Sequence, residues 1–444
     1  MSKWIKEWNP EDERFWAHTG KRIARRNLIW SILAENIGFS VWLLWSITAT
    51  RLPAAGFTYT TDQLFLLVAL PGLVGALMRF PYTFAVPRFG GRNWTVVSAL
   101  LLLIPSVSLA VLVDRPATPF WLMALAACTA GLGGGNFASS MANISFFYPD
   151  REKGLALGLN AAGGNIGVSI VQLVVPIVIG IGGGLHLRNA GLLWLLPIAI
   201  AAVCAFLFMD NLSSARSNAR DQLLVARNKH TWIISFLYVG TFGSFVGYSA
   251  AFPLLLKTQF PEVTTNLAFL GALVGSVARP FGGWLADRLG GARVTLWNFA
   301  FMGVATAGVI NFIQQHNFPG FLLAFLALFL TTGIGNGSTF RMIPPIFRAE
   351  QLRLSATDEE RALAPARARR DAAAAIGICS AIGALGGFFI PRTLGASLKA
   401  TGGASTAFGW FLGGYLLCVA VTWWYYRRRS FLIKQVPSLA NANA

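Results

Sequence analysis

The most regular feature of the chain is a recurring stretch of about 20 apolar residues, the length that crosses the hydrocarbon core of a bilayer as a helix. Twelve such stretches alternate with polar segments. The first six lie at 28–50, 63–86, 94–113, 120–147, 154–183 and 190–209, and the second six at 231–256, 267–286, 294–313, 319–347, 372–398 and 407–426. The pattern predicts an all-α membrane protein with twelve transmembrane helices.

The polar segments between these stretches predict how the chain is divided. A longer polar segment follows the sixth stretch and separates two halves of six helices each. Within the second half, the Ala-, Arg- and Glu-rich stretch 350–372 predicts a surface helix. The expected parts are an N-terminal segment (1–27), an N-terminal six-helix half (28–209), a linker (210–230), a C-terminal six-helix half (231–426, with a loop at 348–371) and a tail (427–444).

Composition supports a membrane protein. Of the 444 residues, 55% are hydrophobic and only 12% are charged, whereas about a quarter of the residues of a soluble domain are charged. A disordered chain is excluded as well, because the sequence contains 34 Phe and 15 Trp. The four cysteines lie far apart in apolar stretches, a pattern typical of neither a disulfide framework nor a metal site.

The positive charges lie mainly on one side of the predicted membrane. The loops on the side of both termini hold 27 Lys and Arg residues, and the opposite loops hold six. Because such residues stay in the cytoplasm, this bias predicts cytoplasmic termini in a multi-pass protein of the cell (inner) membrane. It also accounts for the net charge of +18 without a nucleic-acid partner. The four histidines fall in loops or at span ends, which disfavours a membrane redox enzyme and predicts no cofactor.

The two halves repeat each other in sequence. Residues 76–96 and 276–296 match at an offset of 200, so that Arg79 corresponds to Arg279 and Arg88 to Arg288. The motif GLGGGNF, from Gly131, similarly matches GIGNGST in the second half. Two six-helix halves in the same orientation predict the major facilitator fold, in which the substrate site lies between the halves near mid-membrane.

Arg79 and Arg279 are the main candidates for substrate chemistry. An Arg inside a span costs about 2.5–3.5 kcal/mol on insertion scales. One explanation is structural: the side chains snorkel to the interface or bind backbone carbonyls. The repeat favours another, in which two guanidiniums from equivalent helices bind one anion, because Arg donates parallel hydrogen bonds and keeps its charge.

Glycine-rich stretches in spans 5 and 11 are the second candidate feature. Small residues at this density allow helix backbones to approach closely, which explains most of these glycines. The same stretches would also leave backbone groups, and the amide of Asn165, close to a small ligand.

The chain resembles the nitrate/nitrite porter family of the major facilitator superfamily over nearly its whole length. The segments that carry the resemblance are FTYTTDQLF (57–65), the stretch around Arg79, GGGNFASSMANISFFYP (133–149), glycine-rich spans 5 and 11, TFGSFVGYSA (241–250) and ARPFGGWLADRLGG (278–291). The resemblance implies that Arg79 and Arg279 bind the anion, with no metal and no catalytic residue. Further contacts are implied for Tyr238, Phe39, Phe137, Phe242, Asn165, Gly377 and Ser380.

Each Phe, taken alone, is more often a core residue than a site residue, and only the motif around it favours the site. Residues in the loops between spans 2 and 3 and between spans 8 and 9 resemble the superfamily's gating motif, in which charge pairs hold the halves together. These gating candidates are Arg88, Asp287 and Arg288. Arg341, near the cytoplasmic end of span 10, is interpreted as a gate or interface residue, with snorkelling as the favoured explanation.

Two coupling modes remain open. An empty site with two guanidiniums is costly to close without a counter-ion, which favours exchange of nitrate for nitrite. Beyond these anions and the bilayer we expect no partner, and a monomer is sufficient for this design. Glu35 lies inside span 1 and would instead allow proton-coupled nitrate symport, although it is equally consistent with a structural role. Small carboxylates such as formate remain alternative substrates, and the two-half repeat disfavours an anion channel.

Overall fold

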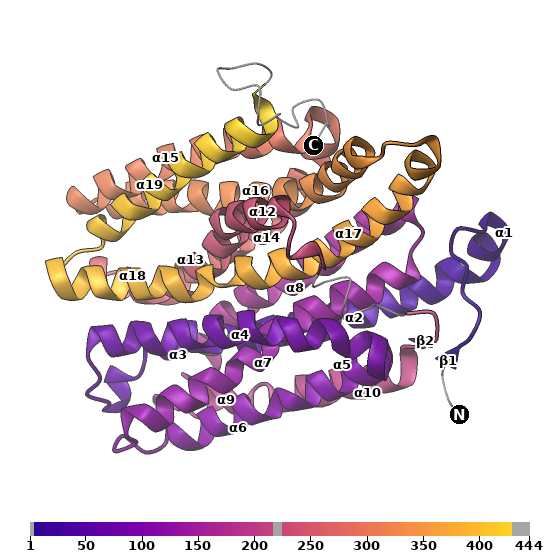
Figure 1. Ribbon diagram of the computed structural model, residues 1–444. Coiled ribbons are helices and arrows are strands. Elements are labelled where there is room, and N and C mark those ends of the chain that lie inside the picture. Colours follow the sequence, from indigo (N-terminus) through magenta and orange to yellow (C-terminus); the bar gives the residue numbers. More distant parts are fainter. Residues whose placement is uncertain (1–3, 216–223, 429–444) are drawn as a thin grey trace.

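The computed structural model describes residues 4–215 and 224–428. Its long helices run roughly side by side and form two groups (Figure 1), the N-terminal half coloured from indigo to magenta and the C-terminal half from pink through orange to yellow. The fold is therefore all-helical apart from one pair of two-residue strands within the described residues. Most of the predicted tail, 427–444, lies outside the described residues.

The N-terminal half contains the following elements. They are β1 (Trp4–Ile5), α1 (Glu13–Phe15), η1 (Trp16–Gly20), α2 (Lys21–Trp42), α3 (Leu44–Thr48), η2 (Pro53–Ala55), α4 (Thr61–Phe89), α5 (Gly91–Leu101), α6 (Leu103–Leu112), α7 (Phe120–Phe147), α8 (Asp150–Val178), α9 (Asn189–Leu192) and α10 (Leu195–Phe208).

The linker and the C-terminal half contain the remaining elements. They are β2 (Asn211–Leu212), α12 (Lys229–Tyr238), η3 (Val239–Gly243), α13 (Ser244–Gln259), η4 (Thr265–Ala268), α14 (Phe269–Leu289), α15 (Gly291–Gln314), α16 (Phe318–Leu354), α17 (Asp358–Ala384), α18 (Gly386–Thr401), α19 (Ser405–Thr422) and η5 (Trp423–Arg427).

The predicted membrane-spanning fold is confirmed. In the described part of the chain, 11 helical segments are long and apolar enough to cross a membrane. Several of these spans consist of two consecutive helices, such as α2 with α3 and α17 with α18. The remaining predicted span corresponds to α14, in which Arg279 lowers the mean hydropathy of an otherwise apolar helix.

Some helices extend beyond the apolar stretches. The first span was predicted from residue 28, but its helix is continuous from Glu13 because a polar helix precedes the membrane segment. The predicted surface helix at 350–372 is divided between two long helices, since α16 continues to Leu354 and α17 begins at Asp358. Thr357 and Glu360 form a capping box there, in which each side chain bonds the other residue's backbone N–H.

The N-terminal segment is attached to the linker between the halves. Trp4 and Ile5 pair in parallel with Asn211 and Leu212. The side chain of Asp12 caps the first helical turn by accepting hydrogen bonds from the backbone N–H groups of Arg14 and Phe15. The residues before α2 are therefore folded against the bundle.

Glycines allow the helices to pack at very short range. A Cβ atom on Gly167 of α8 would lie 2.1 Å from the carbonyl oxygen of Asn36 in α2. Between the halves, a Cβ atom on Gly72 of α4 would lie 2.3 Å from the carbonyl carbon of Gly387 in α18. Both distances are far below van der Waals contact, so close packing accounts for these glycines, as expected for small residues between membrane helices.

Polar contacts join the two halves at both ends of their interface. At one end, Arg392 of α18 pairs with Asp62 of α4 at 2.8 Å. At the other end, Arg369 of α17 pairs with Asp150 at the start of α8 at 3.0 Å. Because the halves touch at both ends, the structure represents a closed conformation around the centre of the bundle.

Candidate functional site

The two repeated arginines lie at the centre of the bundle, one on a helix of each half. Arg79 is in α4 and is 0% exposed, and Arg279 is in α14 and is 4% exposed. Each is close to a proline inside its helix, Pro81 and Pro280 respectively. Snorkelling to the membrane surface therefore does not describe either side chain.

Arg79 is held by backbone oxygens from both halves. Its Nε donates to the carbonyl oxygen of Gly134 at 3.1 Å, and its Nη1 donates to that of Ser380 at 2.7 Å. Gly134 is in α7 of the N-terminal half, and Ser380 is in α17 of the C-terminal half. These bonds fix the plane of the guanidinium group and leave Nη2 without a hydrogen-bond partner among the described residues.

Aromatic rings surround the two guanidinium groups. The Cζ of Arg79 lies 4.6 Å from the ring centroid of Phe137 and 4.8 Å from that of Phe242. The Cζ of Arg279 lies 5.4 Å from the same Phe137 centroid. The two Cζ atoms are thus no more than 4.6 plus 5.4, or 10.0 Å, apart. One small anion could accept hydrogen bonds from both, since each charge-assisted bond is about 2.8 Å long.

The other predicted aromatic residues continue this cluster. Phe137 stacks on Phe242 at 5.7 Å between centroids, and Phe242 stacks on Tyr238 at 5.2 Å. Phe39 contacts Phe137 edge-on at 6.2 Å. All four rings are fully buried. The structure therefore brings Phe39, Phe137, Phe242 and Tyr238 together around the arginines.

A short π-helix positions two of these rings. Residues Val239–Gly243 form η3, which directly follows Tyr238 and contains Phe242. A π-helical turn shifts the register of a helix, and such turns are frequent at functional sites. Here it allows Tyr238 and Phe242 to stack on each other, while the Tyr238 hydroxyl donates to the side-chain oxygen of Asn336 at 2.8 Å.

Several buried polar atoms of the predicted site residues and of Asn336 have no hydrogen-bond partner among the described residues. They are Nη2 of Arg79, Nη1 of Arg279, both amide atoms of Asn165 and Nδ2 of Asn336. An unpaired buried donor costs about 1–3 kcal/mol, and more when it is charged. Unpaired donors on two guanidinium groups, with no carboxylate in an ion pair to either among the described residues, fit a small anionic ligand.

The glycine-rich end of span 11 lies next to Arg79. Ser380 contributes its carbonyl oxygen to Arg79, and its hydroxyl donates to the carbonyl oxygen of Gly377 at 2.9 Å. Gly377 faces Thr83, with 3.6 Å between a Cβ built on the glycine and the threonine methyl. Thr83 itself donates to the carbonyl oxygen of Arg79. Both residues of span 11 therefore lie beside the arginine, and their contact with substrate stays a prediction.

Glu35 of α2 is buried close to both guanidinium groups. Its Oε2 accepts hydrogen bonds from the Ser140 hydroxyl and from Nδ2 of Asn160, the latter at 2.6 Å. The carboxyl group is within electrostatic range of Arg279 and Arg79 but forms no ion pair with either. Its Oε1 has no partner in the described part of the chain. Glu35 thus belongs to the same buried polar region.

Comparison with known proteins decides the family. The model of the Major Facilitator Superfamily matches residues 32–352. The nitrate/nitrite transporter NarU of Escherichia coli (strain K12) is 45% identical, with 96% of this chain and 97% of NarU aligned. The chain belongs to the nitrate/nitrite porter family of the major facilitator superfamily. It is therefore a membrane transporter, as its fold and buried arginines suggest.

Two further similarities support this assignment. The probable nitrate/nitrite antiporter NarK2 of Thermus thermophilus is 36% identical over 96% of this chain and 97% of its own length. Among solved structures, a D-xylose-proton symporter superposes with a TM-score of 0.68 at 16% identity, covering 90% of this chain and 97% of the symporter. At that identity the second match concerns the fold alone.

The three gating candidates of this porter make their contacts within one half or face solvent. Asp287 pairs with Arg341 of α16, which belongs to the same half. Arg288 packs over Trp284, with its Cζ 4.2 Å from the ring centroid, and Arg88 is exposed. In the closed conformation none of the three forms an ion pair between the halves within the described ranges.

The ion-pair partner of Asp287, Arg341, lies against a helix of the other half. A Cβ on Gly154 of α8 would lie 2.5 Å from its Nη1. Arg341 therefore lies at the interface between the halves, the position expected of a gate or interface residue. Its ion pair with Asp287 accounts for its charge without the snorkelling that the sequence favours.

Sequence reasoning missed several neighbours of the arginines. Trp42 lies 5.5 Å from the Cζ of Arg79, and Phe340 lies 5.9 Å from that of Arg279. Asn336 binds Tyr238, while Ser140 and Asn160 bind Glu35. Asn336 could have been found, because it lies in the repeated GIGNGST motif of the porter, whereas no local pattern distinguishes the others.

Proposed function

We propose that this porter moves nitrate and nitrite across the cell (inner) membrane by alternating access, with Arg79 and Arg279 as the anion-binding pair. The observation that carries the proposal is the pair of buried guanidinium groups, each with an unpaired donor, beside one phenylalanine ring. The names of NarU and NarK2, which both refer to nitrate and nitrite, give the anion. The charge bias of the loops supports a cytoplasmic position for both termini.

The shape of the cluster suits a flat, singly charged anion. Guanidinium groups donate in a plane, and the edges of aromatic rings carry the positive part of their quadrupole. Apolar walls disfavour doubly charged or strongly hydrated anions, because part of their hydration would be lost without replacement. We expect Tyr238, Phe39, Phe137, Phe242, Asn165, Gly377 and Ser380 to line this site.

Exchange of nitrate for nitrite is the coupling mode that we favour. Closing both ends around two unpaired guanidinium groups is costly when no anion accompanies them. Nitrate or nitrite lowers the net charge of the site by one and supplies acceptors for the unpaired donors. The loaded porter therefore reaches the closed conformation more easily than the empty porter, and transport requires an anion in each direction. A monomer is sufficient for this cycle.

Proton-coupled symport is the second candidate, and the position of Glu35 supports it. The carboxyl group is buried, its Oε1 is unpaired among the described residues, and both arginines lie within electrostatic range. A proton on this group would remove the negative charge that competes with the substrate for the two arginines. Nitrate and a proton would then enter together.

Uptake of labelled nitrate into liposomes containing the purified porter tests both modes. Exchange predicts uptake that requires internal nitrite and is insensitive to an imposed proton gradient. Symport predicts uptake into empty liposomes that is driven by the gradient. Formate inside in place of nitrite tests the carboxylate alternative. If no internal anion and no gradient supports uptake by the folded porter, the proposal is wrong.

A further inference from the structure

A groove rich in arginine and lysine lies beside the first turns of α2, at the end of the bundle that also carries β1 and β2. It has a volume of about 500 Å³. We call it the basic groove. Its lining residues are Ala17, Lys21, Arg22, Arg25, Arg26, Ile29 and Trp30. None of them belongs to the buried anion site.

Two of the four cations in the basic groove have acidic partners, and two do not. Arg26 pairs with Asp210 at 2.5 Å, and Lys21 lies 3.8 Å from Glu152. Arg22 and Arg25 are exposed and form no ion pair within the described residues. The groove therefore keeps two unneutralised guanidinium groups, one turn apart on the same helix.

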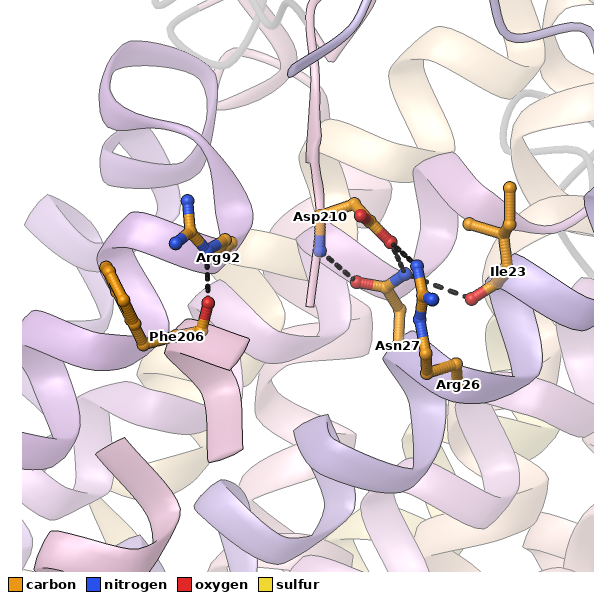
Figure 2. A network of polar contacts seen from close by, with 6 residues as sticks. All are labelled: Ile23, Arg26, Asn27, Arg92, Phe206 and Asp210. Carbon is orange, nitrogen blue, oxygen red and sulfur yellow. Dashed lines mark hydrogen bonds and ion pairs between the residues drawn. The ribbon is translucent and has the colours of Figure 1, made fainter. Parts of the chain in front are cut away.

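The wall of the groove is fixed by a buried polar network (Figure 2). The Nδ2 of Asn27 donates to Oδ2 of Asp210 at 3.0 Å and to the carbonyl oxygen of Ile23. The Oδ1 of Asn27 accepts a hydrogen bond from the backbone N–H of Asp210 at 2.8 Å. Asn27 is fully buried, and Arg26 joins the same Asp210 oxygen. Because Asp210 follows α10, this network ties the start of α2 to the end of α10.

The other end of the groove is apolar and exposed. Ile29 is 51% exposed, and Trp30 stacks on Phe208 with 4.9 Å between ring centroids. The neighbouring Phe206 and Leu207 at the end of α10 are exposed as well. Exposed apolar side chains on membrane helices face lipid, and a tryptophan at such a boundary is typical of the headgroup level.

The spacing along α2 places the charges beside the headgroups. Arg22, Arg25 and Ile29 follow an i, i+3, i+7 pattern, so they lie on one face of the helix. At about 1.5 Å per residue, Arg25 lies roughly 6 Å beyond Ile29 and Arg22 roughly 10 Å beyond it. The headgroup layer on each side of the hydrocarbon core is about 5–8 Å thick. Arg25 is thus level with the lipid headgroups, and Arg22 lies just beyond them, where its long side chain can bend back toward the phosphates.

We propose that the basic groove binds the headgroup of an anionic phospholipid from the adjacent leaflet. Arg22 and Arg25 donate to its phosphate oxygens, and its acyl chains lie along Ile29 and the exposed end of α10. A free phosphate ion would use the charges but not the apolar end of the groove, which is why we assign the site to a lipid. Basic pockets at the ends of membrane helices are suited to such headgroups.

Native mass spectrometry of the full-length porter from a mixture of phosphatidylglycerol and phosphatidylcholine tests this proposal. Arg22→Gln/Arg25→Gln is expected to reduce retention of phosphatidylglycerol relative to phosphatidylcholine about 30-fold, which corresponds to about 1 kcal/mol for each basic residue near an anionic surface. The matched control, Arg361→Gln/Arg367→Gln, removes the same charge from exposed positions of α17 and is expected to retain phosphatidylglycerol like the wild type.

A second measurement uses the wild-type groove directly. In nanodiscs, the fluorescence component that is absent from Trp30→Phe is expected to be quenched more strongly by brominated phosphatidylglycerol than by brominated phosphatidylcholine. Equal quenching by the two lipids would overturn the proposal, and so would equal loss of phosphatidylglycerol in the control variant. If excess inorganic phosphate displaces the lipid as effectively as added phosphatidylglycerol does, the groove binds soluble anions and the lipid assignment is wrong.

Discussion

Replacing Arg79 with lysine tests the anion-binding role of the buried pair without removing its charge. The guanidinium group makes two hydrogen bonds to backbone oxygens, those of Gly134 and Ser380, and presents a third donor, Nη2, that is unpaired in the described residues. A lysine ammonium is a compact group with no fork of fixed donors. It therefore cannot reach both carbonyl oxygens and also present a donor in the plane that Nη2 occupies.

The expected magnitude follows from the donor that the substrate would lose. A hydrogen bond to a charged group contributes about 1.5–3 kcal/mol. At 1.36 kcal/mol for each factor of ten, losing one such bond weakens nitrate binding roughly 10- to 150-fold. Because the same bond stabilises the closed, loaded conformation, the maximal rate of exchange should fall as well as the apparent affinity.

The assay is the concentration dependence of labelled nitrate uptake into liposomes loaded with nitrite. Arg279→Lys should behave like Arg79→Lys, since Arg279 also has an unpaired donor beside Phe137. Arg361→Lys, at an exposed position of α17, is the matched control and should transport like the wild type. Thermal unfolding of each variant separates a site defect from misfolding. Wild-type affinity and rate in Arg79→Lys would refute the anion-clamp reasoning.

Two other predictions concern coupling and closure. Glu35→Gln should preserve nitrate/nitrite exchange and its insensitivity to pH if exchange is the coupling mode, and a loss of gradient-driven uptake in this variant would instead support symport. Gly72→Ala should reduce the exchange rate by roughly tenfold or more, because overpacking costs about 1–3 kcal/mol and the new Cβ would meet the backbone of Gly387 when the halves close. Gly413→Ala, where a Cβ meets no atom within 4 Å, should leave the rate unchanged, and equal rates in the two alanine variants would contradict this account of closure.

The sequence permits good prediction of the parts that repeat. Arg79 and Arg279 are recognisable because each interrupts an apolar span at the same place in its half, and the fold requires equivalent helices to face each other. Asn336 belongs to the same class, since its motif has a counterpart in the first half. A residue that recurs at the same place in both halves is therefore expected to lie at the same depth in the membrane as its counterpart and close to the interface between the halves.

Contacts that depend on helix rotation could not be predicted in this way. Glu35 binds Ser140 and Asn160 from two other helices, and nothing along the chain indicates which face of each helix turns toward it. The π-helix after Tyr238 changes that rotation within one span. The helix before residue 28 was also missed, because a polar helix packed at the membrane surface lacks the long apolar stretch by which the spans were recognised.

The hydrogen bond from Arg79 to the carbonyl oxygen of Ser380 links the two halves of the porter. When the halves separate, this donor loses its backbone partner, so an open site has one more free N–H than the closed site. An arriving anion could use that donor and would then surrender it to Ser380 as the halves come together. The donors Nη2 of Arg79 and Nη1 of Arg279 would stay with the anion throughout, so the loaded site closes without leaving a guanidinium donor unpaired.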